Sequence, residues 1–506
     1  MTAVEATFVA VDLGAESGRA VLGRFDGERM ALEVVHRFPN TPVRLPDGLH
    51  WNVLRIIAEV KDGLARAARK GGRIESLGVD AWGVDFALLD RDGSLISNPY
   101  HYRDPRTEGM EERALDRMPR EEIYGVTGVQ FMPINTLYQL LAMEGSPLLG
   151  AAETLLLIPD LVGYWLTGEK ACEFTNASTT QLCDARSGTW AYDLLEKMGL
   201  PGHIFGKIIA PGTELGPLLP GVAQETGVKK GLPVTAVASH DTASAVVAVP
   251  AEDENFAYIS SGTWSLVGVE LPEAAIAPEG MHANFTNEGG FGGTTRFLKN
   301  VMGLWLLQEC RRSWAGEGRD YSYEELTRLA EAVPAAGSLL DPDHPIFLPL
   351  GDMPGRIRRF CRETDQRPPE KPGEVVRCVL ESLALKYRWV LERAEEITGR
   401  RAGVIHVVGG GVQNTLMCQL TADATRRPVR AGPVEATALG NLMVQAYARG
   451  YLGSLEEIRA AVRGSSVEVH DYQPTGSADE WDEAYEKLRR VMDAAAQLDA
   501  EGASLD

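Results

Sequence analysis

The sequence predicts an α/β protein of two domains, and three observations carry this prediction. The chain has 506 residues, more than one hydrophobic core usually serves, so two domains of roughly two hundred residues or more are expected. Apolar strand patterns alternate with helical patterns through the first half of the chain. Strand-like segments run into turns of small residues at three places far apart in the sequence: 11–19, 260–265 and 407–411.

The first elements follow the order strand, turn, strand, helix. Apolar and small or polar residues alternate through 6–35, which predicts two strands about a turn at 12–19. A helix is predicted to begin near Asn52. Two further strands are predicted at 77–80 and 86–90. The apolar residues of the helix recur at helical spacing: Val53, Ile56, Ile57, Val60, Leu64 and Ala67.

The second half repeats the pattern of the first. Residues 258–267 again form a strand, a glycine turn and a strand, which suits a duplicated domain. We therefore predict an N-terminal domain at 1–249, a C-terminal domain at 250–475 and an acidic helical tail at 476–506. The tail is expected to pack on the C-terminal domain through one apolar face: Trp481, Tyr485, Leu488, Met492 and Ala495.

Composition limits the partners and the compartment. A formal charge of -21 and an isoelectric point near 5.0 argue against nucleic acid or an anionic membrane as a partner. The sequence shows no signal peptide and no apolar stretch of spanning length, so a cytoplasmic protein is expected, as a monomer or a homodimer. The six cysteines form no CxxC pair. Cys361 lies in a polar stretch that we expect to be exposed. Whether it forms a disulfide with Cys378 is left open by the sequence.

The three small-residue turns indicate a nucleotide site. Small residues let backbone N–H groups approach a phosphate without a Cβ in the way. A single such turn would be explained equally well by a tight hairpin. The sequence contains no GxxxxGK[ST] motif and no HRD and DFG set, so a P-loop enzyme and a protein kinase are both excluded.

Two aspartates near these turns are candidates for chemistry. Asp241 follows an apolar strand at the start of a predicted helix, where it could cap the helix or act as a general base for a hydroxyl group. Asp12 ends a strand just before the first turn and could anchor Mg²⁺ directly or through water. Arg19 could offset phosphate charge, although an exposed strand arginine explains it equally well.

These motifs and several others give the chain a resemblance to the FGGY carbohydrate kinase family of the actin, Hsp70 and hexokinase superfamily. The resemblance extends from about residue 7 to about residue 470. It implies two ribonuclease-H-like (actin-like ATPase) domains with a central cleft. Its most specific segments are DLGAESGR at 12–19, WGVDF at 82–86, YRDPRT at 102–107, NTLYQL at 135–140, SHDTASA at 239–245, SSGTWSL at 260–266, LKNVMGLWLLQ at 298–308, VVGGGVQN at 407–414 and AGPVEATALGN at 431–441.

The resemblance implies transfer of the γ-phosphate of ATP, with Mg²⁺, to the 1-hydroxyl of the ketose L-rhamnulose in L-rhamnose catabolism. Asp241 would be the proton acceptor. The implied sugar contacts are Gly83, His240, Asp241, Thr242 and Asn300. The implied ATP contacts are Ala15, Glu16, Ser17, Gly18, Arg19, Thr263, Gln308 and Gly410.

Some of these assignments rest on the resemblance alone. The residue pattern by itself would make the helix around 304–307 part of the core, and it assigns no role to Asn300 or Gln308. The substrate could also be another ketose, such as L-fuculose or L-xylulose. Two other functions also stay open: a sugar-responsive binding protein that kept the site without the chemistry, and a nucleotide-gated chaperone on the same fold. Intact Asp12, Asp241 and turns argue against the binding protein, and the lack of a peptide-binding β-domain argues against the chaperone.

Overall fold

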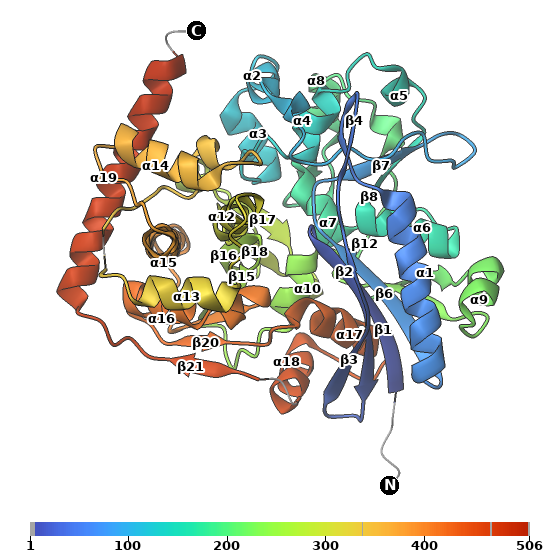
Figure 1. Cartoon of the computed structure of the whole chain (residues 1–506). Helices are drawn as coiled ribbons and strands as arrows, with labels where there is room; N and C mark the ends of the chain where they lie inside the picture. The colour runs from blue at the N-terminus through green and yellow to red at the C-terminus, as the bar shows by residue number, and fades with distance from the viewer. Residues whose placement is uncertain (1–5, 336, 466–467, 504–506) are drawn as a thin grey trace. The chain divides into compact units, whose positions relative to one another are not determined.

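The computed structural model describes residues 6–335, 337–465 and 468–503, so the outermost ends of the predicted domains lie outside the described part of the chain. It contains two compact units (Figure 1). Unit 1 holds the described residues of Met1–Glu252, Glu270–Leu298 and Glu435–Val467, and unit 2 holds those of Asp253–Val269, Lys299–Val434 and Glu468–Asp506. The division into 1–249, 250–475 and 476–506 remains a prediction.

Unit 1 is built on a six-stranded sheet in the order β13-β14-β6-β1-β2-β3. The strand β1 is antiparallel to β2 and parallel to β6, and its register places Asp12 opposite both Arg19 and Asp80. The carboxyl ends of β1 and β6 therefore lie side by side at one edge of the sheet. The strands are β1 (Ala6–Leu13), β2 (Ser17–Phe25), β3 (Met30–Pro39), β6 (Ile74–Ala81), β13 (Thr213–Pro217) and β14 (Pro233–Ala236).

Helices cover both faces of this sheet, which explains why all eight residues of β1 are buried. A Cβ added at Gly23 of β2 would meet Leu442 of α17 (Ala436–Ala448). Ala20 lies three residues before Gly23 on the same strand, so its side chain is expected on the opposite face. It lies against Gly63 of α1 (Val53–Lys70). Because successive strand side chains point to opposite faces, α17 and α1 lie on opposite sides of the sheet.

The helix α10 (Asp241–Val247) packs closely on α17. A Cβ on Gly440 would lie only 1.8 Å from the carbonyl oxygen of Ser244, so this contact requires glycine. The close approach fixes the helix that begins with the predicted base against the sheet of unit 1.

Shorter elements complete unit 1. The small two-stranded sheets pair β4 (Val43–Leu45) with β5 (Gly48–His50), β7 (Phe86–Leu89) with β8 (Thr154–Leu157), β9 (Cys172–Glu173) with β12 (Ile208–Ile209), and β10 (Cys183–Asp184) with β11 (Thr189–Trp190). The other helices are α2 (Met110–Leu115), α3 (Arg120–Thr127), α4 (Thr136–Leu141), α5 (Pro147–Gly150), α6 (Ile158–Thr167), α7 (Phe174–Ala177), α8 (Tyr192–Lys197), α9 (Pro220–Thr226), α11 (Pro278–His282) and α18 (Leu455–Gly464). A hairpin joins β17 (Thr286–Gly289) to the first residues of β18 (Thr295–Met302), through which the chain continues into unit 2.

Unit 2 has its own sheet, in which β16, β15, β19, β20 and β21 are neighbours in that order. The parallel pairing of β15 with β19 sets Ser260 opposite Val408, so the turns that follow these two strands are adjacent. The strands are β15 (Phe256–Ser261), β16 (Trp264–Leu271), β19 (Val404–Val408), β20 (Val429–Ala431) and β21 (His470–Tyr472).

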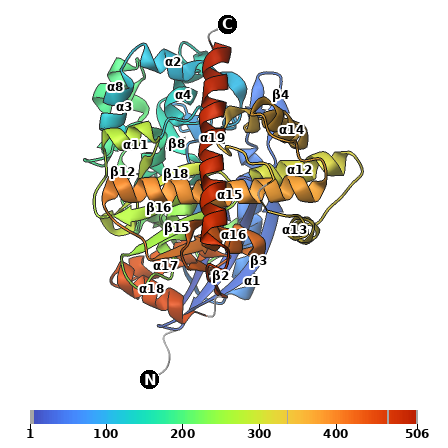
Figure 2. The same ribbon diagram turned by 90° about the vertical axis from the view of Figure 1, so that its left-hand side faces the viewer.

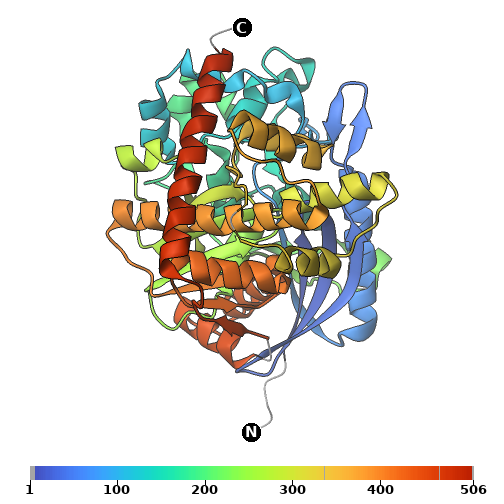
Figure 3. The ribbon, with the colours of Figure 1, turned by 60° about the vertical axis from the view of Figure 1, so that its left-hand side comes forward.

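The long helix α15 is the central helix of unit 2. It contacts α13, α16 and α19, and Figure 2 shows α19 crossing it, a view that Figure 3 confirms from another side. The hydroxyl of Tyr387 on α15 lies 2.6 Å from Ser265 Oγ on β16, which ties the helix to the sheet. The helices are α12 (Trp305–Gly316), α13 (Tyr323–Glu331), α14 (Met353–Glu363), α15 (Pro372–Thr398), α16 (Thr415–Thr425) and α19 (Ala478–Ala503).

Most predicted elements are confirmed, but residues 6–35, predicted to form two strands, also contain the start of a third, β3. The prediction for one cysteine is wrong. The first helix begins at Val53 with Asn52 as its N-cap, and α19 packs through Tyr485, Leu488 and Ala495 as expected. Cys361, expected to be exposed, is buried and free, because it lies on the inner face of α14. Within the described ranges, no helix is both long and apolar enough to cross a membrane.

Candidate functional site

The first small-residue turn lies between β1 and β2 and is shorter than predicted. Only residues 14–16 lie outside the strands, and the N–H of Gly14 donates to the carbonyl of Ser17 at 3.0 Å. Glu16 is exposed, whereas Ala15 and Ser17 are half-buried. Gly18 is buried, and a Cβ there would enter the ring of Phe38 at 2.3 Å. The backbone at this turn is therefore open on one side and closely packed on the other.

Arg19 is the cationic partner of Asp12. Its Nε and Nη2 donate to Asp12 Oδ2 at 2.8 and 2.6 Å, and its Nη1 lies 2.6 Å from Glu435 Oε2. Arg19 is only 21 % exposed, so it is not a free surface arginine. Asp12 Oδ1 has no hydrogen bond within the described ranges, which leaves one carboxylate oxygen for another ligand.

Asp80 is a third carboxylate at this edge of the sheet that the sequence analysis missed. Asn441 Nδ2 donates to its Oδ2 at 2.6 Å, while Oδ1 is buried without a hydrogen-bond partner among the described residues. Burial raises the pKa of Asp80 well above the usual carboxyl value, and the nearby charge of Asp12 raises it further. An aspartate that ends a buried strand is the signal that could have identified it, since Asp12 has the same pattern on β1.

Asp241 is the first residue of α10, and His240 occupies the N-cap position without a side-chain cap bond. The structure therefore does not use Asp241 as the N-cap. Its Oδ1 accepts hydrogen bonds from Thr242 N at 2.5 Å and from Thr242 Oγ1 at 3.2 Å. No donor among the described residues bonds its Oδ2, and the side chain is 28 % exposed. One oxygen is thus anchored and the other can accept a proton.

Two effects of opposite sign act on this carboxyl group. Burial raises the pKa of Asp241 above its usual value, and the two hydrogen bonds from Thr242 oppose that rise. The charge of Asp12 adds to the rise. A raised pKa makes a carboxylate a stronger base, which suits proton abstraction from a hydroxyl group.

A buried charged cluster lies behind His240. Arg296 Nη2 lies 3.1 Å from His240 Nδ1 and 3.1 Å from Glu288 Oε2. Glu288 and Arg296 face each other across the β17–β18 hairpin and are 4 and 0 % exposed. Neither residue was singled out in the sequence, because their meeting with His240 depends on strand register.

The segment around Gly83 forms a strained turn. Val84 has a φ of 65°, unusual for a β-branched residue, and the N–H of Asp85 donates to the carbonyl of Gly83 at 2.9 Å. Thr179 Oγ1 accepts from Val84 N at 3.1 Å, and Thr136 Oγ1 donates to Val84 O at 2.6 Å. These contacts hold the turn in a conformation that an isolated chain would avoid.

Asp85, the residue after Val84, anchors the turn through its side chain. It is fully buried, and its carboxylate accepts from the indole N–H groups of Trp51 and Trp82 at 2.5 and 2.9 Å and from Gln139 Nε2 at 2.8 Å. Burial raises the pKa of Asp85 to about 6, although these donors oppose the rise. The turn at Gly83 is therefore held next to two buried tryptophans, through their hydrogen bonds to Asp85.

In unit 2, the turns at 260–265 and 407–411 lie against each other. A Cβ on Gly411 would lie 2.0 Å from Ser261 Oγ, and one on Gly409, whose φ is 87°, would lie 3.1 Å from Ser261 O. Gly410 is exposed, and nothing lies within 4 Å of its Cβ position. Thr263 O accepts from the N–H of Trp305 at 3.1 Å, so the first turn is also tied to the start of α12. The predicted nucleotide turns of this unit form one cluster.

Gln308 and Asn300 also lie in unit 2. Gln308 is on α12, and its Oε1 is buried without a hydrogen-bond partner among the described residues. Asn300 lies on β18 and is half-buried. The sequence-predicted residues thus divide between the units: those from Asp12 to Thr242 belong to unit 1, and Thr263, Asn300, Gln308 and Gly410 belong to unit 2.

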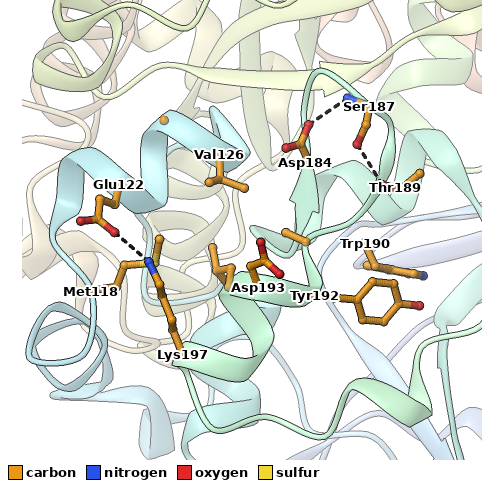
Figure 4. Close-up of a pocket in the computed structure, with 13 residues that line it drawn as sticks. Met118, Glu122, Val126, Asp184, Ser187, Thr189, Trp190, Tyr192, Asp193 and Lys197 are labelled. Atoms are coloured by element: carbon orange, nitrogen blue, oxygen red, sulfur yellow. Dashed lines mark hydrogen bonds and ion pairs between the residues drawn. The ribbon is translucent and has the colours of Figure 1, made fainter.

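Unit 1 also contains a groove, lined by Met118, Glu122, Asp184, Tyr192 and Lys197 among others (Figure 4). Its volume is about 610 Å³, and none of the predicted site residues lines it. Glu122 and Lys197 form an ion pair at its rim at 3.1 Å, and Ser187 N donates to Asp184 Oδ1 at 2.8 Å.

The two sheets, the paired turns and the carboxylates near strand ends fit the actin-like ATPase fold that the sequence predicts. Family models for the FGGY family of carbohydrate kinases match the chain, the N-terminal domain at residues 7–248 and the C-terminal domain at 257–449. The chain belongs to the FGGY family of carbohydrate kinases. Its activity is that of an ATP-dependent sugar kinase.

Two relatives are similar to this chain along nearly their whole length. The protein named rhamnulokinase from Bacteroides thetaiotaomicron is 45% identical over 480 residues, which cover 94% of this chain and 98% of the relative. The rhamnulokinase from Enterococcus faecalis is 41% identical over 475 residues, with coverage of 93% and 95%.

Solved structures share the fold at low sequence identity. A ligand-bound xylulose kinase from Lactobacillus acidophilus has a TM-score of 0.79 and 17% identity, with 99% of both chains covered. A Plasmodium falciparum glycerol kinase with ADP has a TM-score of 0.76 and 14% identity, covering 97% of this chain and 98% of its own. At such identities the likeness shows the fold, and the substrate requires separate argument.

Proposed function

We propose that the chain phosphorylates L-rhamnulose on its 1-hydroxyl with ATP, in L-rhamnose catabolism. The observation that carries this proposal is identity of 41 to 45% to proteins named rhamnulokinase over nearly the full length of both chains. The geometry at Asp241 supports the kinase chemistry independently of those names, because a carboxylate with one anchored and one available oxygen is the group the reaction needs.

In the proposed reaction, Asp241 Oδ2 takes the proton of the 1-hydroxyl as O1 bonds to the γ-phosphorus of ATP. The bond from that phosphorus to the bridging oxygen breaks, and ADP leaves with the electron pair. Thr242 holds Oδ1 through two hydrogen bonds, so the carboxylate is oriented before the sugar binds. The raised pKa of Asp241 strengthens it as a base.

The sugar contacts of unit 1 are proposed for the backbone at Gly83 and for the side chains of His240 and Thr242. The strained turn at Val84 supports this role, since strain of this kind persists at functional sites where the surroundings hold it. Asn300 of unit 2 is proposed as a further sugar contact on family resemblance. Backbone and hydroxyl groups of these types can bond the several hydroxyls of a ketose.

The nucleotide contacts are proposed for the turns and the residues beside them. In unit 1, the backbone of Ala15 to Gly18 would bind phosphate oxygens, and Arg19 would offset their charge. In unit 2, Thr263 and Gly410 belong to the turn cluster, and the unpartnered Oε1 of Gln308 supports a contact with the nucleotide.

Mg²⁺ is proposed as the metal, with Asp12 as its anchor. No group of three or more His, Cys, Asp or Glu side chains within the described ranges converges in a way that could hold a metal ion. Mg²⁺ usually binds through one or two carboxylates, water and substrate phosphates. Asp12 Oδ1 is the available oxygen, since Oδ2 is bonded to Arg19. When bound, the ion would offset the charge of the phosphates.

We further propose a cytoplasmic enzyme that acts as a monomer or a homodimer on its ketose and MgATP.

ADP release tests the proposed substrate. The purified chain would be assayed with MgATP against L-rhamnulose, L-fuculose, L-xylulose, D-xylulose and glycerol. We expect the highest kcat/KM with L-rhamnulose. The control variant Asp193→Asn changes an aspartate in the first turn of α8, far from the predicted residues in the sequence, and should keep full activity. A clear preference for another ketose would contradict L-rhamnulose as the substrate. No turnover with any acceptor would favour a sugar-responsive binding protein.

A further inference from the structure

We propose that Arg296 and Glu288 are positioning residues that hold His240 in one tautomer, with its proton on Nε2 and facing Asp241. The inference rests on the proposed function, because it takes Asp241 as the proton acceptor. It goes beyond that function by assigning a role to a buried ion pair, Glu288 and Arg296, that would touch neither sugar nor nucleotide.

The position of Arg296 decides which ring nitrogen carries the proton. Its Nη2 lies 3.1 Å from His240 Nδ1, within hydrogen-bonding distance. A guanidinium group can only donate, so Nδ1 must accept. In a neutral imidazole the other nitrogen, Nε2, then carries the hydrogen.

Glu288 and the hairpin backbone hold Arg296 in that position. The two residues are direct cross-strand partners, and Arg296 Nη2 lies 3.1 Å from Glu288 Oε2. Arg296 Nε donates to the carbonyl of Gly289 at 2.9 Å. The side chain is fully buried, so its geometry is set by these partners. Glu288 Oε2 lies 3.3 Å from His240 Nδ1, which is longer than the contact from Arg296 to the same nitrogen.

The tautomer matters because of what Nε2 faces. It lies 3.5 Å from Asp241 Oδ1, the oxygen that already accepts two hydrogen bonds from Thr242. With its hydrogen on Nε2, His240 adds a third favourable dipole to this oxygen and leaves Oδ2 as the proton acceptor. With the hydrogen on Nδ1, a lone pair would face the carboxylate and repel it. Arg296 and Glu288 therefore act on the base through His240.

The tautomer can be measured without turnover. Nitrogen-15 NMR of the full chain, labelled at its histidines, distinguishes a protonated ring nitrogen from an unprotonated one. The signals of His240 would be assigned by their loss in the variant His240→Gln. We expect the ring to carry its proton on Nε2, with Nδ1 unprotonated. A proton on Nδ1, on either a neutral or a doubly protonated ring, would overturn the proposal.

The variant Arg296→Lys tests the role of the guanidinium. It keeps the positive charge beside Glu288 but loses the planar fork that reaches Nδ1. We expect a second tautomer of His240 to appear and kcat to fall about tenfold, with KM values for sugar and ATP nearly unchanged. Unchanged tautomer and kcat would contradict the role of Arg296. A shifted tautomer with unchanged kcat would contradict the role of the tautomer in the reaction.

Two further variants keep the test interpretable. If Arg296→Lys does not fold, the double variant Glu288→Met with Arg296→Met removes both buried charges together, and the same two changes are expected. The matched control is Arg459→Lys, in another ion pair of unit 1, where Arg459 and Glu270 lie 2.8 Å apart and are 12 and 11 % exposed. It should leave the tautomer and kcat unchanged. The predicted tautomer in a chain without sugar kinase activity would support the assignment at His240 while contradicting the proposed function.

Discussion

The contact between α10 and α17 offers a sharp test of how the fold positions the predicted base. We consider Gly440→Ala, because a Cβ at this position would lie 1.8 Å from Ser244 O and 2.6 Å from Ser244 C. Both are backbone atoms that cannot swing aside. Ordinary van der Waals contact begins at 3.4 Å, so the two helices would have to separate by about 1.6 Å at this point.

The expected effect on stability combines two opposing terms. Replacing a helical glycine by alanine gains about 1 kcal/mol in helix propensity. Overpacking of a tight core contact costs about 1 to 3 kcal/mol and occasionally more, and a clash with backbone belongs at the upper end of that range. We therefore expect Gly440→Ala to destabilise the protein by about 2 kcal/mol. Since α10 begins with Asp241, a shift of this helix by about 1 Å should also lower kcat by about 10²-fold.

Urea denaturation and steady-state kinetics would be compared with those of Gly125→Ala. Gly125 lies inside α3, and no atom lies within 4 Å of its Cβ position. This control should raise the free energy of unfolding by about 0.5 to 1 kcal/mol and leave kcat unchanged. A variant Gly440→Ala as stable and as active as the unmodified chain would refute the reasoning.

Three further predictions concern protonation, metal and nucleotide. Burial raises the pKa of Asp85 to about 6, whereas the unfolded chain has an ordinary aspartate pKa of about 4. The folded state therefore binds an extra proton between roughly pH 4 and 6. As pH rises through this window, the contribution of Asp85 to the free energy of unfolding falls by roughly 3 kcal/mol. Asp85→Asn should remove that slope from the pH dependence of the free energy of unfolding, and parallel curves for the two proteins would contradict the assignment. Asp12→Asn should raise the Mg²⁺ concentration needed for half-maximal activity by about tenfold, whereas an unchanged requirement would remove Asp12 as the anchor. Gly409 has a φ of 87°, so Gly409→Ala should strain the turn by about 1 to 2 kcal/mol. We expect the KM for ATP to rise while the KM for the sugar stays constant. Equal changes in both KM values would contradict a nucleotide role for this turn.

The parts of the structure that depend on local pattern could be predicted from the sequence. Asn52 followed by apolar residues at helical spacing is sufficient to place the start of α1, and the apolar face of α19 is visible in the same way. Asp241 at a strand end followed by small residues identified the start of α10. Such signals arise from caps and periodicity, which act over a few residues.

The parts that depend on long-range pairing could not be predicted in this way. Arg19 lies against Glu435, more than four hundred residues later, and no local pattern records that pairing. The meeting of Arg296 with His240 requires both the hairpin register and the packing of α10. The polar stretch around Cys361 indicated exposure, but the helical phase of α14 turns this residue inward.

Asp241→Asn, measured for binding and turnover together, tests the central claim most directly. Calorimetric titration would give the Kd for L-rhamnulose, and ADP release would give kcat. Because asparagine keeps the shape of the side chain but cannot take the proton, we predict sugar binding within a fewfold of that of the unmodified chain and a loss of kcat of about 10² to 10⁴-fold. Near-normal kcat, or lost sugar binding with normal turnover of the bound complex, would contradict the account of an L-rhamnulose kinase that uses Asp241 as its base.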